Sequence, residues 1–299
     1  ARQSIFRQPK LVFSLLALAA LINGLTDYGL RPLAVKGQIE APGSTFTFEE
    51  WNTFSRVIVH PTSTRRPRMW GPSPTMPWNR WRIDQRLMTI DGDAGTTMYR
   101  FTEDKDDADF LKYDVTNLAY FLPGRERAAV IGVGGGRDVL SAWTFGLRDI
   151  TAVEINPIFI KLLTELEDYA DFAGLSKLEG IDFVVDEARS WFTRTRQTFG
   201  VIQMSLVDTW AATTAGAFTL SENGLYTREA WQIFLERLTP KGVFSVSRWY
   251  TPGKYNEAGR MVSLATAALM ALGNENPRRH IFLASTGNIA TLLVSRSPL

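Results

Sequence analysis

The sequence predicts an α/β fold in which helices flank a mostly parallel sheet. Three observations support this prediction. From residue 128 onwards, short apolar runs of strand character alternate with helical segments. A glycine-rich turn joins the first of these strands to a helix, and acidic residues end the next two strands. Because such alternation builds right-handed βαβ units, a ligand is expected at the carboxyl ends of the strands.

The composition is that of a globular protein. With 45% hydrophobic and 21% charged residues, the 299-residue chain can form one large domain, or one domain and an extension. A net charge of +2 gives no electrostatic argument for nucleic acid, so no nucleic-acid partner is predicted. The sequence has no cysteine, and its two histidines, His60 and His280, are far apart. These facts speak against disulfides, thiolate catalysis, a zinc site and a serine–histidine hydrolase, so no metal is predicted.

Residues 1–40 are predicted to contain a hydrophobic helix and a linker. Residues 11–25 are nearly all apolar, and a helix extended to residue 30 would reach roughly 30 Å, the thickness of a bilayer core. Three interpretations remain open: a transmembrane helix, the hydrophobic region of a signal peptide, or a helix that is buried or faces a partner. The first is favoured, and it predicts that residues 11–30 contact a membrane or a membrane-protein partner.

Residues 41–105 are predicted to form a small β-domain. Residues 55–60 have strand character, and the five prolines of residues 61–77 predict a loop, because proline cannot pair within a central strand. Three tryptophans beside this loop, Trp70, Trp78 and Trp81, are predicted to form a lid, a membrane-interface belt or packing beneath the loop, and the last is favoured. Residues 82–91 and 96–100 then predict two paired strands joined by a turn that contains Gly-Asp.

Residues 129–140 form the centre of the predicted site, because they combine a buried strand, a glycine turn and the start of a helix. The turn holds four glycines: Gly132, Gly134, Gly135 and Gly136. Without side chains there, a ligand can lie against backbone N–H groups at the helix N-terminus. The dinucleotide pattern G-x-G-x-x-G fails at its last position, which is Arg137. Asp138 is predicted either to start the helix or to bind the ammonium group of the ligand.

Acidic residues follow the next two predicted strands. Glu154 lies near the end of strand 150–155, about twenty residues beyond Gly134, where a carboxylate can accept both hydroxyls of a ribose. Strand 181–185 ends at Asp186, which is predicted to accept the adenine amino group, and Glu187 beside it is included in the cofactor site. A glycine turn, a ribose acid and a third acid, in that order, are typical of an S-adenosylmethionine site.

Linked motifs between about residues 99 and 250 carry a resemblance to a known family. They are Leu-Lys-Tyr-Asp at 111–114, Ile-Gly-Val-Gly-Gly-Gly at 131–136, Val-Glu-Ile-Asn-Pro at 153–157, Val-Asp-Glu-Ala at 185–188 and Leu-Tyr-Thr-Arg-Glu-Ala at 225–230. With these motifs the chain resembles the spermidine synthase (polyamine aminopropyltransferase) family, a branch of the Rossmann-like methyltransferase fold. Gly-Gly-Gly-Arg-Asp and residues 50–56 are more closely similar to spermidine-synthase-like domains attached to bacterial membrane proteins.

The resemblance implies the following architecture and site. Residues 106–299 would form a Rossmann-like domain with an antiparallel last strand, and the β-hairpin of the small N-terminal domain would cover the active site. The cofactor would be S-adenosylmethionine or its decarboxylated form, and the acceptor a small amine. A helix over residues 110–122 would bring Tyr113, which matches a family tyrosine, to the substrate pocket. The protein would be membrane-associated with a cytoplasmic catalytic domain, and a homodimer stays open.

The end of strand 201–206 departs from the family. Spermidine synthases carry Asp-Ser-Ser-Asp there, and the first carboxylate is the general base that acts on the attacking amine. Ser205 takes its position here, while Asp208 matches the second aspartate. A neutral hydroxyl cannot take a proton from an ammonium near pH 7, whereas methyl transfer mainly needs in-line positioning of the acceptor. Ser205, Asp208 and Tyr113 are the predicted catalytic residues, and residues 211–217 form either a gate or a plain surface loop.

Two hypotheses about function follow. The first is a spermidine-synthase-like transferase that moves a methyl or aminopropyl group from S-adenosylmethionine or its decarboxylated form to a small amine or related acceptor. The second is a catalytically inactive subunit of a membrane assembly that keeps the nucleotide-binding fold. The serine at position 205 and the apolar N-terminal segment favour the second hypothesis.

Overall fold

The computed structural model of the chain contains two compact units, Ala1–Ser44 and Thr45–Leu299. The structure describes residues 9–25, 34–35, 38–39, 45–92, 94–207, 222–254 and 256–299.

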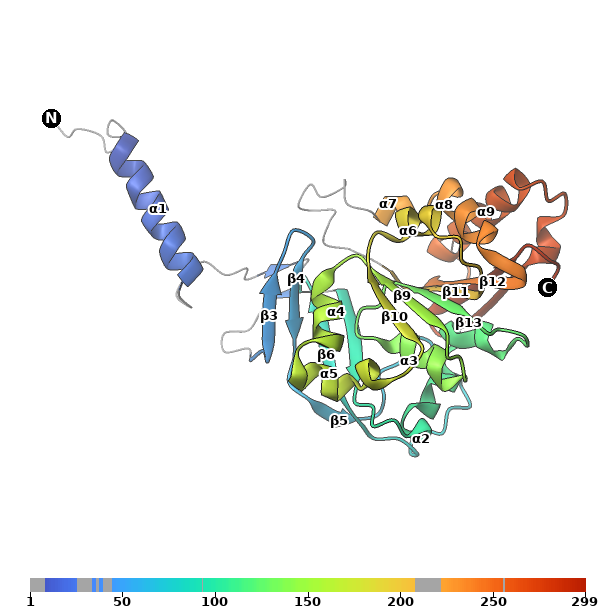
Figure 1. The fold of residues 1–299 in the computed structure, drawn as a ribbon, viewed down its shortest axis with the longest axis horizontal. Helices are drawn as coiled ribbons and strands as arrows, with labels where there is room; N and C mark the ends of the chain where they lie inside the picture. The colour runs from blue at the N-terminus through green and yellow to red at the C-terminus, as the bar shows by residue number, and fades with distance from the viewer. Residues whose placement is uncertain are drawn as a thin grey trace. The chain divides into compact units, whose positions relative to one another are not determined.

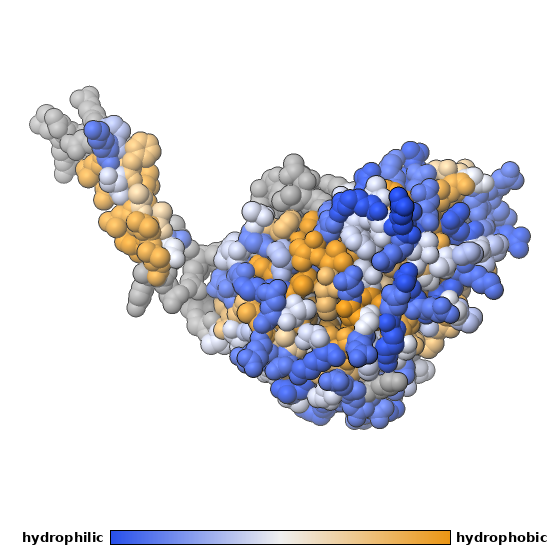
Figure 2. All heavy atoms as spheres, in the orientation of Figure 1, coloured by the Kyte–Doolittle hydropathy of each residue, from blue (hydrophilic) through white to orange (hydrophobic). Residues whose placement is uncertain are grey.

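The described residues of the first unit form helix α1 (Pro9–Leu25) and a short antiparallel pair, β1 (Ala34–Val35) with β2 (Gln38–Ile39). The surface of α1 is largely hydrophobic (Figure 2), and Phe13 is 70% exposed. Within the described ranges, no helix combines the length and the apolar character needed to cross a membrane. The predicted transmembrane helix is therefore not supported; residues 26–30 lie outside the described residues, and the predicted membrane partner stays a prediction.

The second unit is built on a seven-stranded sheet (Figure 1). Its strands lie in the order β10 (Ile181–Val185), β9 (Ile150–Glu154), β8 (Ala128–Ile131), β11 (Phe199–Ser205), β12 (Leu238–Trp249), β14 (Ile289–Ser295) and β13 (Ile281–Thr286). The first five strands are parallel, and β14 runs antiparallel to both of its neighbours. This arrangement confirms the predicted parallel sheet with an antiparallel last strand.

Helices cover both faces of this sheet. One face is covered by α3 (Arg137–Thr144), α4 (Pro157–Thr164) and α5 (Glu167–Ala173). The other face is covered by α6 (Ala188–Arg194), α8 (Arg228–Glu236) and α9 (Glu257–Ala271). Four further helices are short: α2 (Lys105–Ala108), η4 (Leu175–Lys177), α7 (Glu222–Leu225) and η6 (Pro277–His280). Alternate residues of β8 join the two hydrophobic clusters, Ala128 and Val130 on the first face and Ala129 and Ile131 on the second. Two layers of helices therefore enclose a buried sheet, which explains its continuous apolar strands.

The small N-terminal sheet is antiparallel. Its strands are β3 (Phe48–Trp51), β4 (Arg56–Val59), β6 (Ile83–Ile90) and β5 (Ser63–Arg65) in that order, with β7 (Ala94–Tyr99) also paired to β6. The β6–β7 pair is the predicted hairpin. Gly135, in the turn after β8, packs against the backbone of Thr97 in β7, so this hairpin lies against the glycine turn.

The predicted helix over residues 110–122 is wrong. Two 3₁₀ helices, η2 (Asp109–Tyr113) and η3 (Val115–Phe121), occupy this segment, and Asp114 between them is extended with φ −100° and ψ 130°. Its carboxylate accepts hydrogen bonds from the backbone N–H groups of Thr116 at 3.1 Å and Trp70 at 3.0 Å. Because these bonds hold Asp114 outside helical geometry, a continuous helix cannot form through it.

Candidate functional site

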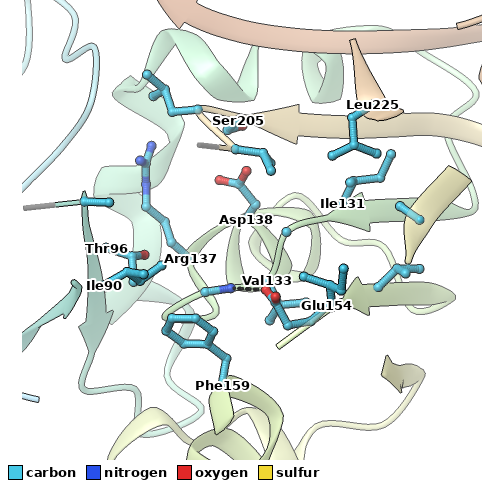
Figure 3. A pocket seen from close by; sticks show the side chains of 18 of the residues that line it. Ile90, Thr96, Ile131, Val133, Arg137, Asp138, Glu154, Phe159, Ser205 and Leu225 are labelled. Atoms are coloured by element: carbon cyan, nitrogen blue, oxygen red, sulfur yellow. Dashed lines mark hydrogen bonds between the residues drawn. The ribbon is translucent and has the colours of Figure 1, made fainter. Parts of the chain in front are cut away.

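A cavity of about 420 Å³ lies at the carboxyl ends of β8, β9 and β11 (Figure 3). The β6–β7 hairpin contributes Ile90 and Thr96 to its wall, and the helix after the glycine turn contributes Arg137 and Asp138. The volume is within the range of small-molecule sites, about 300–1,000 Å³. The cavity therefore lies at the edge of the sheet where the alternating pattern predicted a ligand.

The structure brings most of the predicted site residues to this cavity. Its lining includes Gly132, Gly134, Asp138, Glu154, Asp186, Glu187 and Ser205. Gly135, Gly136 and Tyr113 are not part of the lining. Asp208 and the predicted gate at residues 211–217 lie outside the described residues.

Glu154 is buried at the end of β9 and faces both the glycine turn and the cavity. Its Oε2 accepts a hydrogen bond from Gly134 N at 3.0 Å, and its Oε1 accepts one from Asn156 N at 2.9 Å. Burial raises the pKa of Glu154 above its usual value, and the backbone N–H groups around the carboxylate counteract part of that rise. The Glu154 carboxylate therefore stabilises the turn, and because it lines the cavity, its unused lone pairs can accept hydrogen bonds from a ligand there.

Two of the predicted glycines serve the ligand side of the turn. Gly132 and Gly134 adopt φ values of +78° and +50°, which favour glycine. A Cβ on Gly132 would lie 2.6 Å from a methyl group of Val207, and one on Gly134 would lie 3.1 Å from the hydroxyl of Thr96. Both positions border the cavity, so side chains there would narrow it.

The other two glycines allow close packing within the protein and are not part of the cavity lining, so their predicted ligand contact stays a prediction. A Cβ on Gly135 would lie 2.6 Å from the carbonyl group of Thr97, and one on Gly136 would collide with Leu175. Gly136 also has a φ of +82°. Because these two glycines lack side chains, β7 and η4 can approach the turn closely. Both elements are distant from the turn in the sequence.

The acids after β10 have different tasks. Asp186 forms an ion pair with Arg194 and accepts a hydrogen bond from Glu187 N at 2.8 Å. Glu187 is the N-cap of α6, because its carboxylate accepts hydrogen bonds from Arg189 N at 2.9 Å and Ser190 N at 2.8 Å. The Glu187 carboxylate is thus committed to the helix, while Asp186, 26% exposed, keeps an accessible edge at the cavity.

Tyr113 is placed differently from its prediction. Its ring packs on Trp81, with 5.7 Å between the ring centroids, and against the hydrophobic core cluster that includes Trp81 and Phe110. Tyr113 is the last residue of η2, which ends at the extended Asp114, and it is not part of the cavity lining.

Asp138, from the start of α3, and Ser205, from the end of β11, both line the cavity. Asp138, in the first turn of α3, is only 6% exposed, and burial raises the pKa of its carboxyl. The charge on Arg137 and the hydroxyl of Ser205 lower that pKa again. The N-cap position of α3 is Gly136, and no side-chain hydrogen bond caps the helix there. Asp138 is therefore not the N-cap residue, and it lines the cavity.

The sequence analysis missed several residues of the wall. Arg137, treated only as a mismatch to a glycine pattern, is 5% exposed and forms an ion pair with Asp114 at 2.8 Å. Its Nε has no hydrogen-bond partner among the described residues. Trp70 and Trp249 also line the cavity and meet edge to face, with ring centroids 6.0 Å apart. Trp249 is the last residue of β12, and the carboxyl ends of parallel strands are where a ligand is expected. Trp70 is among the tryptophans for which a lid is one of the predicted roles, although packing beneath the loop is favoured.

No protein-family model and no curated protein matches the sequence. Among solved structures, a probable spermidine synthase from Corynebacterium glutamicum ATCC 13032 is similar with 14% identity, coverage of 87% of this chain and 82% of that chain, and a TM-score of 0.53. The corresponding values for the spermidine synthase from Thermotoga maritima are 13%, 85%, 74% and 0.52. For a spermidine synthase in complex with the transition state analogue AdoDATO they are 12%, 85%, 73% and 0.50. These likenesses confirm the predicted fold: the chain has the α/β, Rossmann-like architecture of spermidine synthases.

Proposed function

We propose that the chain binds S-adenosylmethionine or its decarboxylated form in the cavity and transfers a methyl or aminopropyl group to a small acceptor. One observation carries the proposal: the buried Glu154 carboxylate lies beside the glycine turn in the same cavity as Asp186. Glu154 would hold the ribose hydroxyls and Asp186 the adenine amino group. A similar structure is that of a spermidine synthase in complex with the transition state analogue AdoDATO, which supports a cofactor of this class.

The walls of the cavity support a nucleoside in this orientation. Apolar side chains of Ile131, Val153 and Leu225 line the same cavity as the two acids, where they would pack on the faces of a base. The β6–β7 hairpin forms part of the cavity wall, where it would help to exclude water from the reacting atoms. A sulfonium supplies an electrophilic carbon, so the chain's main task is to hold the acceptor in line with it.

Replacing Glu154 with glutamine is expected to weaken binding of 5′-methylthioadenosine by about 1.5–3 kcal/mol, roughly 10- to 150-fold, because ribose hydroxyls lose a charged acceptor. Isothermal titration calorimetry measures the change. Glu165→Gln, at an exposed position outside the cavity, serves as the matched control and should leave the affinity unchanged.

Deoxy forms of the same nucleoside separate ribose recognition from bracing of the turn. The 2′-deoxy and 3′-deoxy probes already lack a hydroxyl, so Glu154→Gln should cost less binding energy with them than with the parent nucleoside. An equal loss with all three probes would show that Glu154 acts only on the turn, and the ribose assignment would be withdrawn.

Turnover distinguishes the transferase from a silent binding module. The protein is incubated with labelled S-adenosylmethionine or its decarboxylated form and a panel of small amines, and labelled product is measured. Product formation supports the transferase. Binding without product across the panel supports the silent module, and the absence of binding contradicts both functions.

A further inference from the structure

We propose that Asp138 is the proton acceptor of the transfer reaction, and that it supplies from α3 the carboxylate that the end of β11 lacks. This inference rests on the proposed function. Ser205 then has a role of its own, because its hydroxyl positions the Asp138 carboxyl group.

The topology of the sheet places the two residues together. Because β8 and β11 are adjacent and parallel, their carboxyl ends meet at one edge of the sheet. Ser205 is the last residue of β11, and Asp138 lies in the first turn of the helix that follows β8. Both line the cavity, and Figure 3 shows the Asp138 carboxyl group pointing towards Ser205. An acid on α3 thus reaches the corner that an acid at position 205 would occupy.

A network of hydrogen bonds orients the Ser205 hydroxyl. Gln203 Nε2 donates to Ser205 Oγ at 3.1 Å, and Gln203 Oε1 accepts from the hydroxyl of Tyr120 at 2.6 Å. The amide of Gln203 is therefore fixed, and it occupies an acceptor site of Ser205. The proton of the Ser205 hydroxyl is left to donate to Asp138, whose charged form it stabilises. One side of the carboxyl group is held in this way, and the other faces the cavity.

The charges around Asp138 suit a proton acceptor. The titratable groups that act on it or respond to it are Arg137, Asp114, Tyr99 and Tyr120. Arg137, the cation that acts on Asp138, forms its ion pair with Asp114. Asp138 itself forms no salt bridge among the described residues. Burial raises the pKa of Asp138, and a carboxylate with a raised pKa is a stronger base.

The proposed step balances without another reactant. A neutral acceptor nitrogen forms the new bond to carbon through its lone pair and loses its proton to Asp138. The carbon–sulfur bond breaks with its electron pair remaining on sulfur, so the sulfonium leaves as a neutral thioether. Asp138 then returns the proton to solvent when product departs. The same residue serves methyl and aminopropyl transfer, because in both a sulfonium is converted to a neutral thioether, S-adenosylhomocysteine in the first case and 5′-methylthioadenosine in the second.

The test compares three variants with the wild type across the amine panel and over a range of pH. Asp138→Asn should lower kcat by about 10²–10⁴-fold while S-adenosylhomocysteine still binds. Ser205→Ala removes an interaction that lowers the pKa of Asp138, so the acidic limb of the rate profile should move to higher pH. The exchange Asp138→Ser with Ser205→Asp should restore part of the lost rate, because the carboxylate returns to the same corner. Asp182→Asn, on the exposed side of β10, is the control.

A spectroscopic measurement accompanies the rates. In protein labelled with ¹³C at the aspartate carboxyl groups, the NMR resonance that Asp138→Asn removes should titrate above the usual aspartate range, and Ser205→Ala should move its titration to still higher pH. A resonance that titrates normally, or that ignores Ser205→Ala, contradicts the pairing of these residues.

Each outcome separates this inference from the proposed function. Wild-type turnover with an Asp138→Asn variant of equal kcat and equal pH profile overturns the inference and leaves the transferase intact. An exchange variant that binds S-adenosylhomocysteine but stays as slow as Asp138→Asn also overturns it. Absence of turnover in the wild type would contradict the proposed transferase activity, and with it the role of Asp138 in that reaction.

Discussion

Replacing Asp114 with alanine is expected to lower the free energy of unfolding by about 3–5 kcal/mol, because it leaves a buried charge without its partner. Arg137 Nη2 lies 2.8 Å from Asp114 Oδ2, and the two side chains are 5% and 0% exposed. The guanidinium group cannot lose its charge by deprotonation at neutral pH. The same substitution removes the acceptor of the Trp70 N–H and of the Thr116 N–H.

Chemical denaturation of the variant measures this loss, and an exposed ion pair provides the control. Arg127 and Asp149 lie 2.6 Å apart with side chains 40% and 50% exposed, so Asp149→Ala should cost no more than about 1 kcal/mol. Combining Asp114→Ala with Arg137→Met should recover part of the stability, because no unpaired charge remains. Equal effects of Asp114→Ala and Asp149→Ala would contradict the buried-charge argument.

The Asp114 variant also tests how Trp70 is held in the wall of the cavity. Trp70 belongs to the proline-rich loop, and its backbone N–H donates a hydrogen bond to Asp114. Losing that bond should loosen Trp70 and so alter the wall of the cavity. The loss of stability and the change in the cavity wall would therefore have one origin.

The fold was predictable because its signals are local. Buried parallel strands are continuous apolar runs, and helix starts follow capping rules. For example, the side chain of Asn156 accepts a hydrogen bond from Ile158 N at 3.1 Å, and Pro157 lies in the first turn of α4. Glu154 followed from its place at a strand end, since parallel strands bring their carboxyl ends to one edge.

The remainder depends on partners distant in the sequence. The apolar pattern of residues 110–122 fits a helix, but Asp114 is held extended by Trp70 and pairs with Arg137. Likewise, the glycine motif predicted space for a ligand, whereas Gly135 accommodates a strand some forty residues earlier in the chain. Neither partner can be inferred from the spacing of residues around the motif.

Replacing Gly135 with alanine is expected to destabilise the protein by about 1–3 kcal/mol and to weaken nucleoside binding. The new Cβ would lie 2.6 Å from the carbonyl carbon and oxygen of Thr97 and 2.9 Å from Met98 N. These are backbone atoms, so no side-chain rotation relieves the overlap, and β7 must move. Thr96 lines the cavity on the same strand, so this movement distorts the ligand site.

Denaturation and calorimetry with 5′-methylthioadenosine measure the two effects, and Gly259→Ala in α9 is the matched control. A Cβ at Gly259 meets nothing within 4 Å, so that variant should keep its affinity and gain up to about 1 kcal/mol of stability from helix propensity. Gly135 has no positive φ, which makes the contact with β7 the sole expected source of its cost. A Gly135→Ala protein as stable as the control would mean that the hairpin is not held against the turn, and the covered cavity would then lose its physical basis.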